Sequence, residues 1–167
     1  MSKTRGGLRK GANRLKYIKI PEILFSGKRN LPWNEVEKYI SKYTGTSITI
    51  VETGDIIQIG SHFASEYCGS LYTRKLHGTL EKAKANASLV ITELLKNATN
   101  RRWVENKDEK HSNDAKGGWY RYDVFFSIPV NFAGEISWNN YRGTIVARIN
   151  DNGIYIHDLI NIKKEDS

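Results

Sequence analysis

The chain has 167 residues, a formal net charge of +8 and a single cysteine. This length allows one domain with its own hydrophobic core, and one cysteine excludes an internal disulfide framework and a cysteine-based zinc cluster. No apolar run is long enough to span a membrane, and the basic N-terminus lacks the apolar stretch of a signal peptide. We therefore expect no membrane partner.

The excess positive charge lies at the N-terminus. Residues 1–30 hold nine basic residues and one acidic residue, whereas residues 31–167 hold 17 of each. A basic, glycine-containing segment suits contact with nucleic acid or with an acidic partner, and it suits a solubilising linker equally well. We predict a basic flexible arm or linker over 1–30 and a single domain over 31–167.

Short elements are expected in the first part of the chain. Residues 17–20 predict a short strand. Asn34 and Glu37 have the spacing of a capping box, which predicts a helix that ends near Tyr43. Two short β-branched stretches, 47–51 and 56–59, predict strands separated by a turn.

A long helix is predicted next, over residues 73–97. Apolar residues recur there at spacings of four and three and would form one buried stripe: Leu76, Leu80, Ala83, Ala87, Val90 and Leu94. The polar stretch after this helix favours a short helix between Trp103 and Ser112.

The C-terminal third predicts three strands, 120–130, 141–149 and 154–162, the last two joined by a hairpin turn. Alternation places apolar residues on one face of each strand, and Asp158 falls on that face, where it would need a partner. The opposite face is polar and carries Arg121, Arg142, Thr144, Arg148, Tyr155 and His157. We predict an α+β domain, with N-terminal helices packed on one face of a roughly four-stranded antiparallel sheet.

The candidate site is the stretch from Thr99 to Asp123. It gathers cations, aromatic side chains and a histidine: Arg101, Arg102, Trp103, Lys110, His111, Lys116, Trp119, Tyr120, Arg121 and Tyr122. These are the side chains needed to hold a phosphate backbone, stack on a base and move a proton. The alternative interpretation is a solvated loop beside an ordinary run of charge.

A metal-independent ribonuclease needs a group that moves protons and a cation for the charge that develops on the phosphate. His111 is the first candidate for the proton, because Lys110, Lys116 and Trp119 would favour an anion beside it. His157, on the polar sheet face, is the second candidate. His111 and Asp114 stand three residues apart, as metal ligands can, but this spacing is common by chance. We expect no metal and no cofactor.

The chain also resembles a C-terminal domain of phage and mobile-element proteins, which include large polyvalent proteins and MuF-type and other polymorphic toxins. The resemblance rests on these stretches: IIQIGSHFASEYCGSLYTRKL (56–76), AKANA (83–87), TNRRWVEN (99–106), EKHSNDAKGGWYRYDVFFSIPV (109–130) and IHDLINIKKEDS (156–167). That domain is grouped with the barnase–EndoU–colicin–RelE-like nucleases, which are small α+β RNases. The resemblance therefore implies a barnase/EndoU-like nuclease fold and metal-free RNA cleavage.

The resemblance also ranks the histidines. The family has a Lys-His pair that matches Lys110-His111, a run that matches residues 119–123, and an arginine that matches Arg148. At His62, His77 and His157 the family has other residues, which favours His111 and counts against His157.

Together these features predict a toxin ribonuclease that leaves a 2′,3′-cyclic phosphate. His111 would be the general acid or base, with Arg121 and Arg148 on the scissile phosphate and Lys75 or Lys116 adding positive charge. Substrate contacts are expected from Lys110, Lys116, Arg102, Trp103, Trp119 and Tyr120. Two alternatives stay open: a non-enzymatic nucleic-acid-binding or phage structural module, and a nuclease-like fold that acts on another substrate.

The predicted toxin would meet tRNA or another cellular RNA in the cytoplasm of the producing or target bacterial cell. It could be delivered as part of a larger secreted or phage-borne protein. The expected protein partner is an acidic immunity protein that covers the site.

Overall fold

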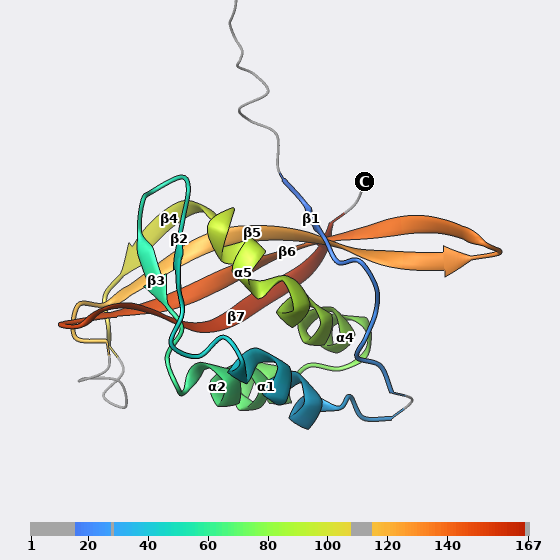
Figure 1. Cartoon of the computed structure of the whole chain (residues 1–167), viewed down its shortest axis with the longest axis horizontal. Coiled ribbons are helices and arrows are strands. Elements are labelled where there is room, and N and C mark those ends of the chain that lie inside the picture. The colour runs from blue at the N-terminus through green and yellow to red at the C-terminus, as the bar shows by residue number, and fades with distance from the viewer. Residues whose placement is uncertain (1–15, 28, 108–114, 166–167) are drawn as a thin grey trace, which may run out of the picture.

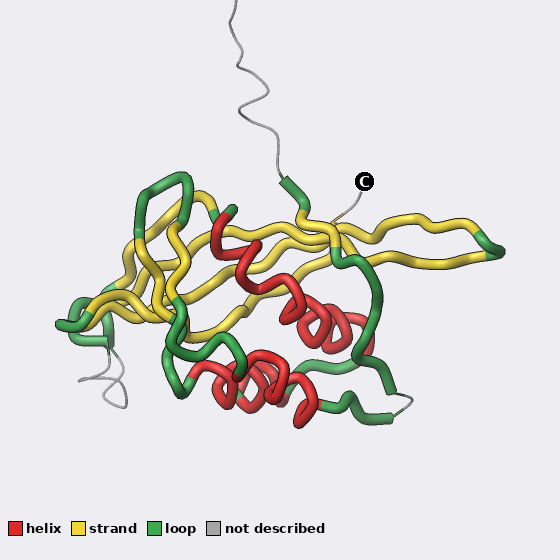
Figure 2. Tube along the Cα trace, viewed as in Figure 1, coloured by secondary structure: helices red, strands yellow, loops and turns green. Residues whose placement is uncertain are grey.

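The computed structural model describes residues 16–27, 29–107 and 115–165 of the chain. Figure 1 and Figure 2 show its sheet and the helices that cover one face of it. The strands are β1 (Ile18–Lys19), β2 (Ser47–Thr49), β3 (Ile56–Gln58), β4 (Thr99–Val104), β5 (Trp119–Phe132), β6 (Glu135–Asn150) and β7 (Gly153–Glu165). The helices are α1 (Trp33–Ser41), α2 (Phe63–Gly69), α3 (Leu71–Arg74), α4 (Gly78–Ala87), the 3-10 turn η3 (Ser88–Val90) and α5 (Ile91–Lys96).

The predicted four-stranded antiparallel sheet is wrong. The described strands form one seven-stranded sheet with the order β1-β5-β6-β7-β3-β2, and β4 pairs with β5. Two of the pairings are parallel, β1 with β5 and β3 with β7, so the sheet is mixed. It is strongly curled, like half of a barrel. The error arose because these parallel pairings join segments far apart in sequence, which periodicity cannot reveal.

β5 and β6 agree with the predicted alternation, whereas two register shifts against β6 break it in β7. β5 and β6 pair from Trp119–Arg148 to Phe132–Glu135, and Tyr122, Val124 and Phe126 are buried on the inner face. The ladder is longer than predicted because Ala133 and Gly134 both take positive φ, at 54° and 82°, and close a tight hairpin. The tip of this hairpin projects beyond β7 (Figure 1).

The predicted single helix over 73–97 is interrupted twice. His77 is extended and Gly78 has a φ of +64°, which separates α3 from α4. A 3-10 turn over Ser88–Val90 then separates α4 from α5. Ala83, Ala87 and Leu94 of the predicted stripe are nevertheless buried. The predicted helix near 103–112 does not begin within the described residues, since β4 continues to Val104.

Part of the segment 1–30 packs against the domain. Ile18 and Lys19 form β1, and Ile20 and Phe25 are buried. The fully buried Asn86 of α4 holds this segment, because its side-chain oxygen accepts hydrogen bonds from the backbone N–H groups of Leu24 and Phe25. Its amide nitrogen donates to the Phe25 carbonyl at 2.8 Å.

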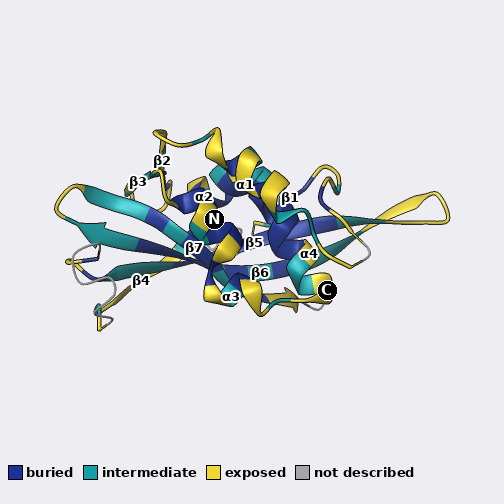
Figure 3. Ribbon diagram, turned by 90° about the horizontal axis from the view of Figure 1, so that it is seen from below, coloured by how far each residue is buried: buried dark blue, intermediate teal, exposed yellow. Residues whose placement is uncertain are grey.

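The core lies between the inner face of the sheet and the helices, where Figure 3 shows the buried residues concentrated. Its largest buried side chains include Tyr67, Tyr122, Phe63 and Phe126. Among the described residues, no helix is both long enough and apolar enough to cross a membrane.

Candidate functional site

The outer face of the sheet carries a row of aromatic and cationic side chains. Trp119 of β5 is opposite Arg148 of β6, which is opposite Tyr155 of β7. The Arg148 guanidinium lies 4.9 Å from the centre of the Tyr155 ring, which is cation–π distance. The pairing register therefore places Trp119, which lies just before the predicted strand 120–130, beside Arg148 and Tyr155, which alternation had assigned to the polar face.

A β-bulge in β7 places His157 beside this row of side chains. Val146 is opposite Asp158 and Ala147 is opposite Ile156, so His157 is the extra residue. A bulge redirects the side chains around it. Here Ile156 stays in the core, while the His157 ring lies edge-on to Trp119 with ring centres 5.0 Å apart.

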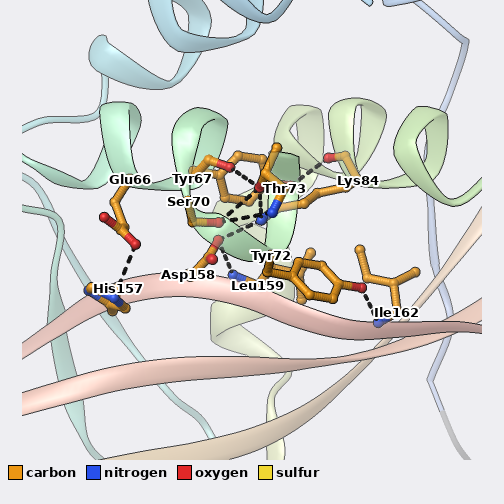
Figure 4. A network of polar contacts seen from close by, with 10 residues as sticks. All are labelled: Glu66, Tyr67, Ser70, Tyr72, Thr73, Lys84, His157, Asp158, Leu159 and Ile162. Carbon is orange, nitrogen blue, oxygen red and sulfur yellow. Dashed lines mark hydrogen bonds and ion pairs between the residues drawn. The ribbon is translucent and has the colours of Figure 1, made fainter. Parts of the chain in front are cut away.

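Glu66 of α2 reaches the histidine from the neighbouring helix. β3 pairs with β7 at Ile154 and Tyr155, and α2, which follows β3 in the chain, contacts β7 as well. Glu66 of α2 therefore comes close to His157. The His157 Nε2 atom lies 3.3 Å from the Glu66 Oε2 atom, and the side chains are 17% and 35% exposed. Figure 4 shows the two side chains facing each other. The carboxylate can orient the imidazole and stabilise its protonated form.

Arg121 stands two residues after Trp119 on the same face of β5. Its Nε atom is shielded from solvent and has no hydrogen-bond partner among the described residues. A buried polar atom without a partner is costly, and a guanidinium in this position is ready to bind an anion through its planar fork.

Two hollows meet at Trp119 and Arg121. The first has a volume of about 290 Å³ and is also lined by Glu66, Ser70, Leu71, Tyr72, Val146, His157, Asp158 and Ile160. The second is larger and more open, at about 840 Å³, and is also lined by Trp103, Val104, Glu105, Asn106 and Lys107. The first hollow is the candidate active site, because His157, Glu66 and Arg121 all line it.

A buried ion pair lies beside His157, between β7 and the helices (Figure 4). Lys84 of α4 is fully buried, and its Nζ atom lies 2.6 Å from the Asp158 Oδ1 atom and 2.5 Å from the Thr73 hydroxyl. Burial raises the pKa of Asp158 and lowers the pKa of Lys84, and the attraction between the two groups opposes both shifts. The pair connects α3 and α4 to the bulge and so holds His157 at the first hollow.

The other predicted site residues are more dispersed. Arg102 is opposite Arg121 but pairs with Asp123 at 3.1 Å. Tyr120 lies on the opposite face of β5, where the Arg101 guanidinium is 4.6 Å from its ring centre. Lys116 is exposed and lies 3.5 Å from Asp151.

Lys75 is exposed at the end of α3 and does not line either hollow. His111 and Lys110 lie outside the described residues. The sequence interpretation did not identify Glu66, which is an isolated carboxylate on a short helix and carries no motif. His157 was only the second candidate, through its position on the polar face, and the family resemblance counted against it.

Among the described residues, no group of three or more His, Cys, Asp or Glu side chains is arranged to hold a metal ion. No family model matches this chain, and searches of curated proteins and of solved structures found no significant match.

Proposed function

We propose that this chain is an endoribonuclease that cleaves RNA without a metal ion and leaves a 2′,3′-cyclic phosphate. One observation carries the proposal: His157 contacts Glu66 in a hollow where the Nε atom of Arg121 lacks a hydrogen-bond partner among the described residues. A proton-transfer group, a carboxylate that orients it and an anion-binding guanidinium are the parts that RNA transesterification needs.

The proposed reaction is a displacement at phosphorus. His157 takes the proton from the ribose 2′-hydroxyl, whose oxygen forms a bond to phosphorus while the bond to the 5′ oxygen breaks. Glu66 stabilises the imidazolium, which returns the proton to the departing 5′ oxygen. Arg121 binds the phosphate oxygens as negative charge develops on them. The products are a 2′,3′-cyclic phosphate and a 5′-hydroxyl.

The test is cleavage of total RNA by the purified full chain in the presence of EDTA, with the new ends mapped. We expect discrete cuts with cyclic-phosphate ends from the wild type, and none from His157→Ala. His77→Ala is the matched control, because His77 is exposed at the start of α4 and lies outside both hollows. Thermal unfolding of each variant separates loss of chemistry from loss of fold.

His111→Ala belongs in the same experiment, since the sequence favours His111. If His111→Ala abolishes cleavage and His157→Ala does not, the proton-transfer role passes to His111. If the wild type leaves all RNA intact, the chain is not a ribonuclease, and the non-enzymatic nucleic-acid-binding module becomes the better interpretation.

This activity fits a toxin that acts in the cytoplasm of a bacterial cell, where tRNA and other RNA are available. A protein that cleaves its own cell's RNA needs an inhibitor, and the net charge of +8 favours an acidic immunity protein. Co-expression tests this part of the proposal: an immunity protein should restore growth and bind the purified chain.

A further inference from the structure

The second hollow contains a tryptophan that is exposed but held in place. The Trp103 residue is 59% exposed, which is unusual for the largest aromatic side chain. Its indole Nε1 atom donates a hydrogen bond to the Gly117 carbonyl at 2.9 Å, between β4 and the start of β5. The ring is therefore both accessible and oriented before any ligand binds.

Gly118 makes this position possible. Its φ is +92°, a left-handed conformation that other residues rarely adopt. A Cβ atom at Gly118 would lie 2.7 Å from the Trp103 Nε1 atom and 2.8 Å from the Val104 carbonyl oxygen. Any side chain at this position would displace the indole, so glycine is required for the ring to stay where it is.

The second hollow shares part of its lining with the first. Trp119 and Arg121 line both, and Lys107 adds a cation to the lining of the second. An anion bound at Arg121 would therefore lie between the His157–Glu66 pair and the hollow that contains Trp103. In a polynucleotide, the group attached to such a phosphate is the neighbouring nucleotide.

We propose that the second hollow is a base-stacking subsite, in which Trp103 binds the base of the nucleotide next to the cleaved phosphate. This inference rests on the proposed function, because that function places the phosphate at Arg121. A base offers its face to an indole only when it is unpaired and unstacked, so the substrate is single-stranded RNA at this point. A ring that is already oriented loses little conformational entropy on binding.

Binding of a fluorescein-labelled 2′-O-methyl RNA hexamer of mixed sequence, followed by anisotropy, tests the subsite without cleavage. Aromatic stacking is worth about 1–3 kcal/mol per base, so Trp103→Ala should raise the Kd about fivefold to a hundredfold or more. Trp103→Phe should retain most of the affinity. Gly118→Ala should weaken binding because it moves the ring. The same hexamer annealed to its complement should show no dependence on Trp103.

Trp138→Ala is the matched control, because Trp138 lies on the projecting β5–β6 hairpin, where its ring contacts Lys19. Its Kd should equal that of the wild type. If Trp103→Ala binds the hexamer as tightly as the wild type, or if the wild type does not bind it, the subsite is wrong. Thermal unfolding shows whether each variant is folded, and Trp103→Phe supplies a milder change if the alanine variant is not.

Cleavage of an unmodified hexamer separates this inference from the proposed function. Binding that depends on Trp103 without any cleavage would overturn the ribonuclease and keep a single-strand-binding subsite. Cleavage with the same kcat/KM in the wild type and Trp103→Ala would keep the ribonuclease and overturn the subsite. We expect cleavage by both proteins, with the alanine variant impaired mainly in KM.

Discussion

Lys84 and Asp158 form an ion pair that is closed to solvent, with 2.6 Å between Nζ and Oδ1 and side-chain exposures of 0% and 4%. The pair is also close to the candidate site, because Asp158 lines the first hollow and directly follows His157. Such a pair contributes little net stability relative to apolar residues, but removal of one partner leaves a buried charge. We interpret its role as specificity, since it determines where α3 and α4 meet the β7 bulge.

Lys84→Met should therefore destabilise the domain. We expect the free energy of unfolding to fall by about 3–5 kcal/mol, because the buried Asp158 carboxylate loses its cation. Urea denaturation followed by tryptophan fluorescence measures this change. Lys82→Met is the matched control, two residues away on the same helix and exposed, and should stay within about 0.5 kcal/mol of the wild type. Equal stability of the two variants would contradict the structural role of the pair.

Gly143 is required for packing between β6 and β7. A Cβ atom there would lie 2.9 Å from the Leu159 Cδ1 atom and 3.5 Å from the Ile162 Cγ1 atom, in the core. We expect Gly143→Ala to lower the free energy of unfolding by about 1–3 kcal/mol, the usual cost of overpacking.

Gly69→Ala is the control for that substitution. Gly69 ends α2, and among the described residues an added Cβ would meet no atom within 4 Å apart from its chain neighbours and the backbone of its own helix. Alanine favours the helix by up to about 1 kcal/mol over glycine, so this variant should be as stable as the wild type or more stable. Thermal unfolding of both variants measures the difference, and destabilisation of the same size in both would show that β6–β7 packing is not the cause.

Asp55 makes the domain sensitive to acid. Burial alone would raise its pKa, but hydrogen bonds from Thr53, Tyr122 and Arg101 outweigh burial and lower the pKa below its ordinary value. Tyr122 and Arg101 each donate at 2.9 Å. Since the unfolded chain binds this proton more tightly, the stabilisation is present above the unfolded pKa of about 3.9 and disappears as the pH falls through the lower folded value.

Asp55→Asn should remove this part of the acid sensitivity. We expect the variant to be less stable than the wild type at pH 7, and the difference between them to shrink as the pH falls below about 4. Urea denaturation at a series of pH values measures it. Asp151→Asn changes an exposed aspartate at the β6–β7 turn and should follow the wild-type curve. A constant difference between wild type and Asp55→Asn across this range would disprove the role of Asp55.

The sequence predicted where the C-terminal strands lie, because their side chains alternate with a period of two over most of their length. It did not predict the register shifts that break this alternation in β7. It did not predict the turn at Ala133–Gly134, which lacks the asparagine or aspartate that usually precedes glycine in such turns. It also did not predict the break at Gly78, because one glycine does not outweigh a periodic apolar stripe. The parallel pairings of β1 and β3 were missed for a third reason, since each joins segments far apart in sequence and involves only two residue pairs.

Some residues of the candidate site could be predicted from the sequence and others could not. Arg121 and Arg148 could be predicted, because alternation along a strand determines the face on which a side chain lies. Glu66 could not, because its contact with His157 depends on how α2 packs along β7. Lys84 was also missed as the partner of Asp158, because a lysine within a helix is usually taken to be exposed.

Arg121→Lys tests most directly whether the phosphate binds at Arg121. The substitution keeps the positive charge but loses the planar fork that holds two phosphate oxygens, so we expect kcat/KM for RNA cleavage to fall about tenfold to a hundredfold. Cleavage of a fluorogenic RNA hexamer measures it. Arg74→Lys, on the exposed side of α3 and outside both hollows, should match the wild type. Because Arg121 Nε has no hydrogen-bond partner among the described residues, the fold should tolerate lysine, and unchanged melting would confirm this. Full activity of Arg121→Lys would mean that the phosphate does not bind at this guanidinium.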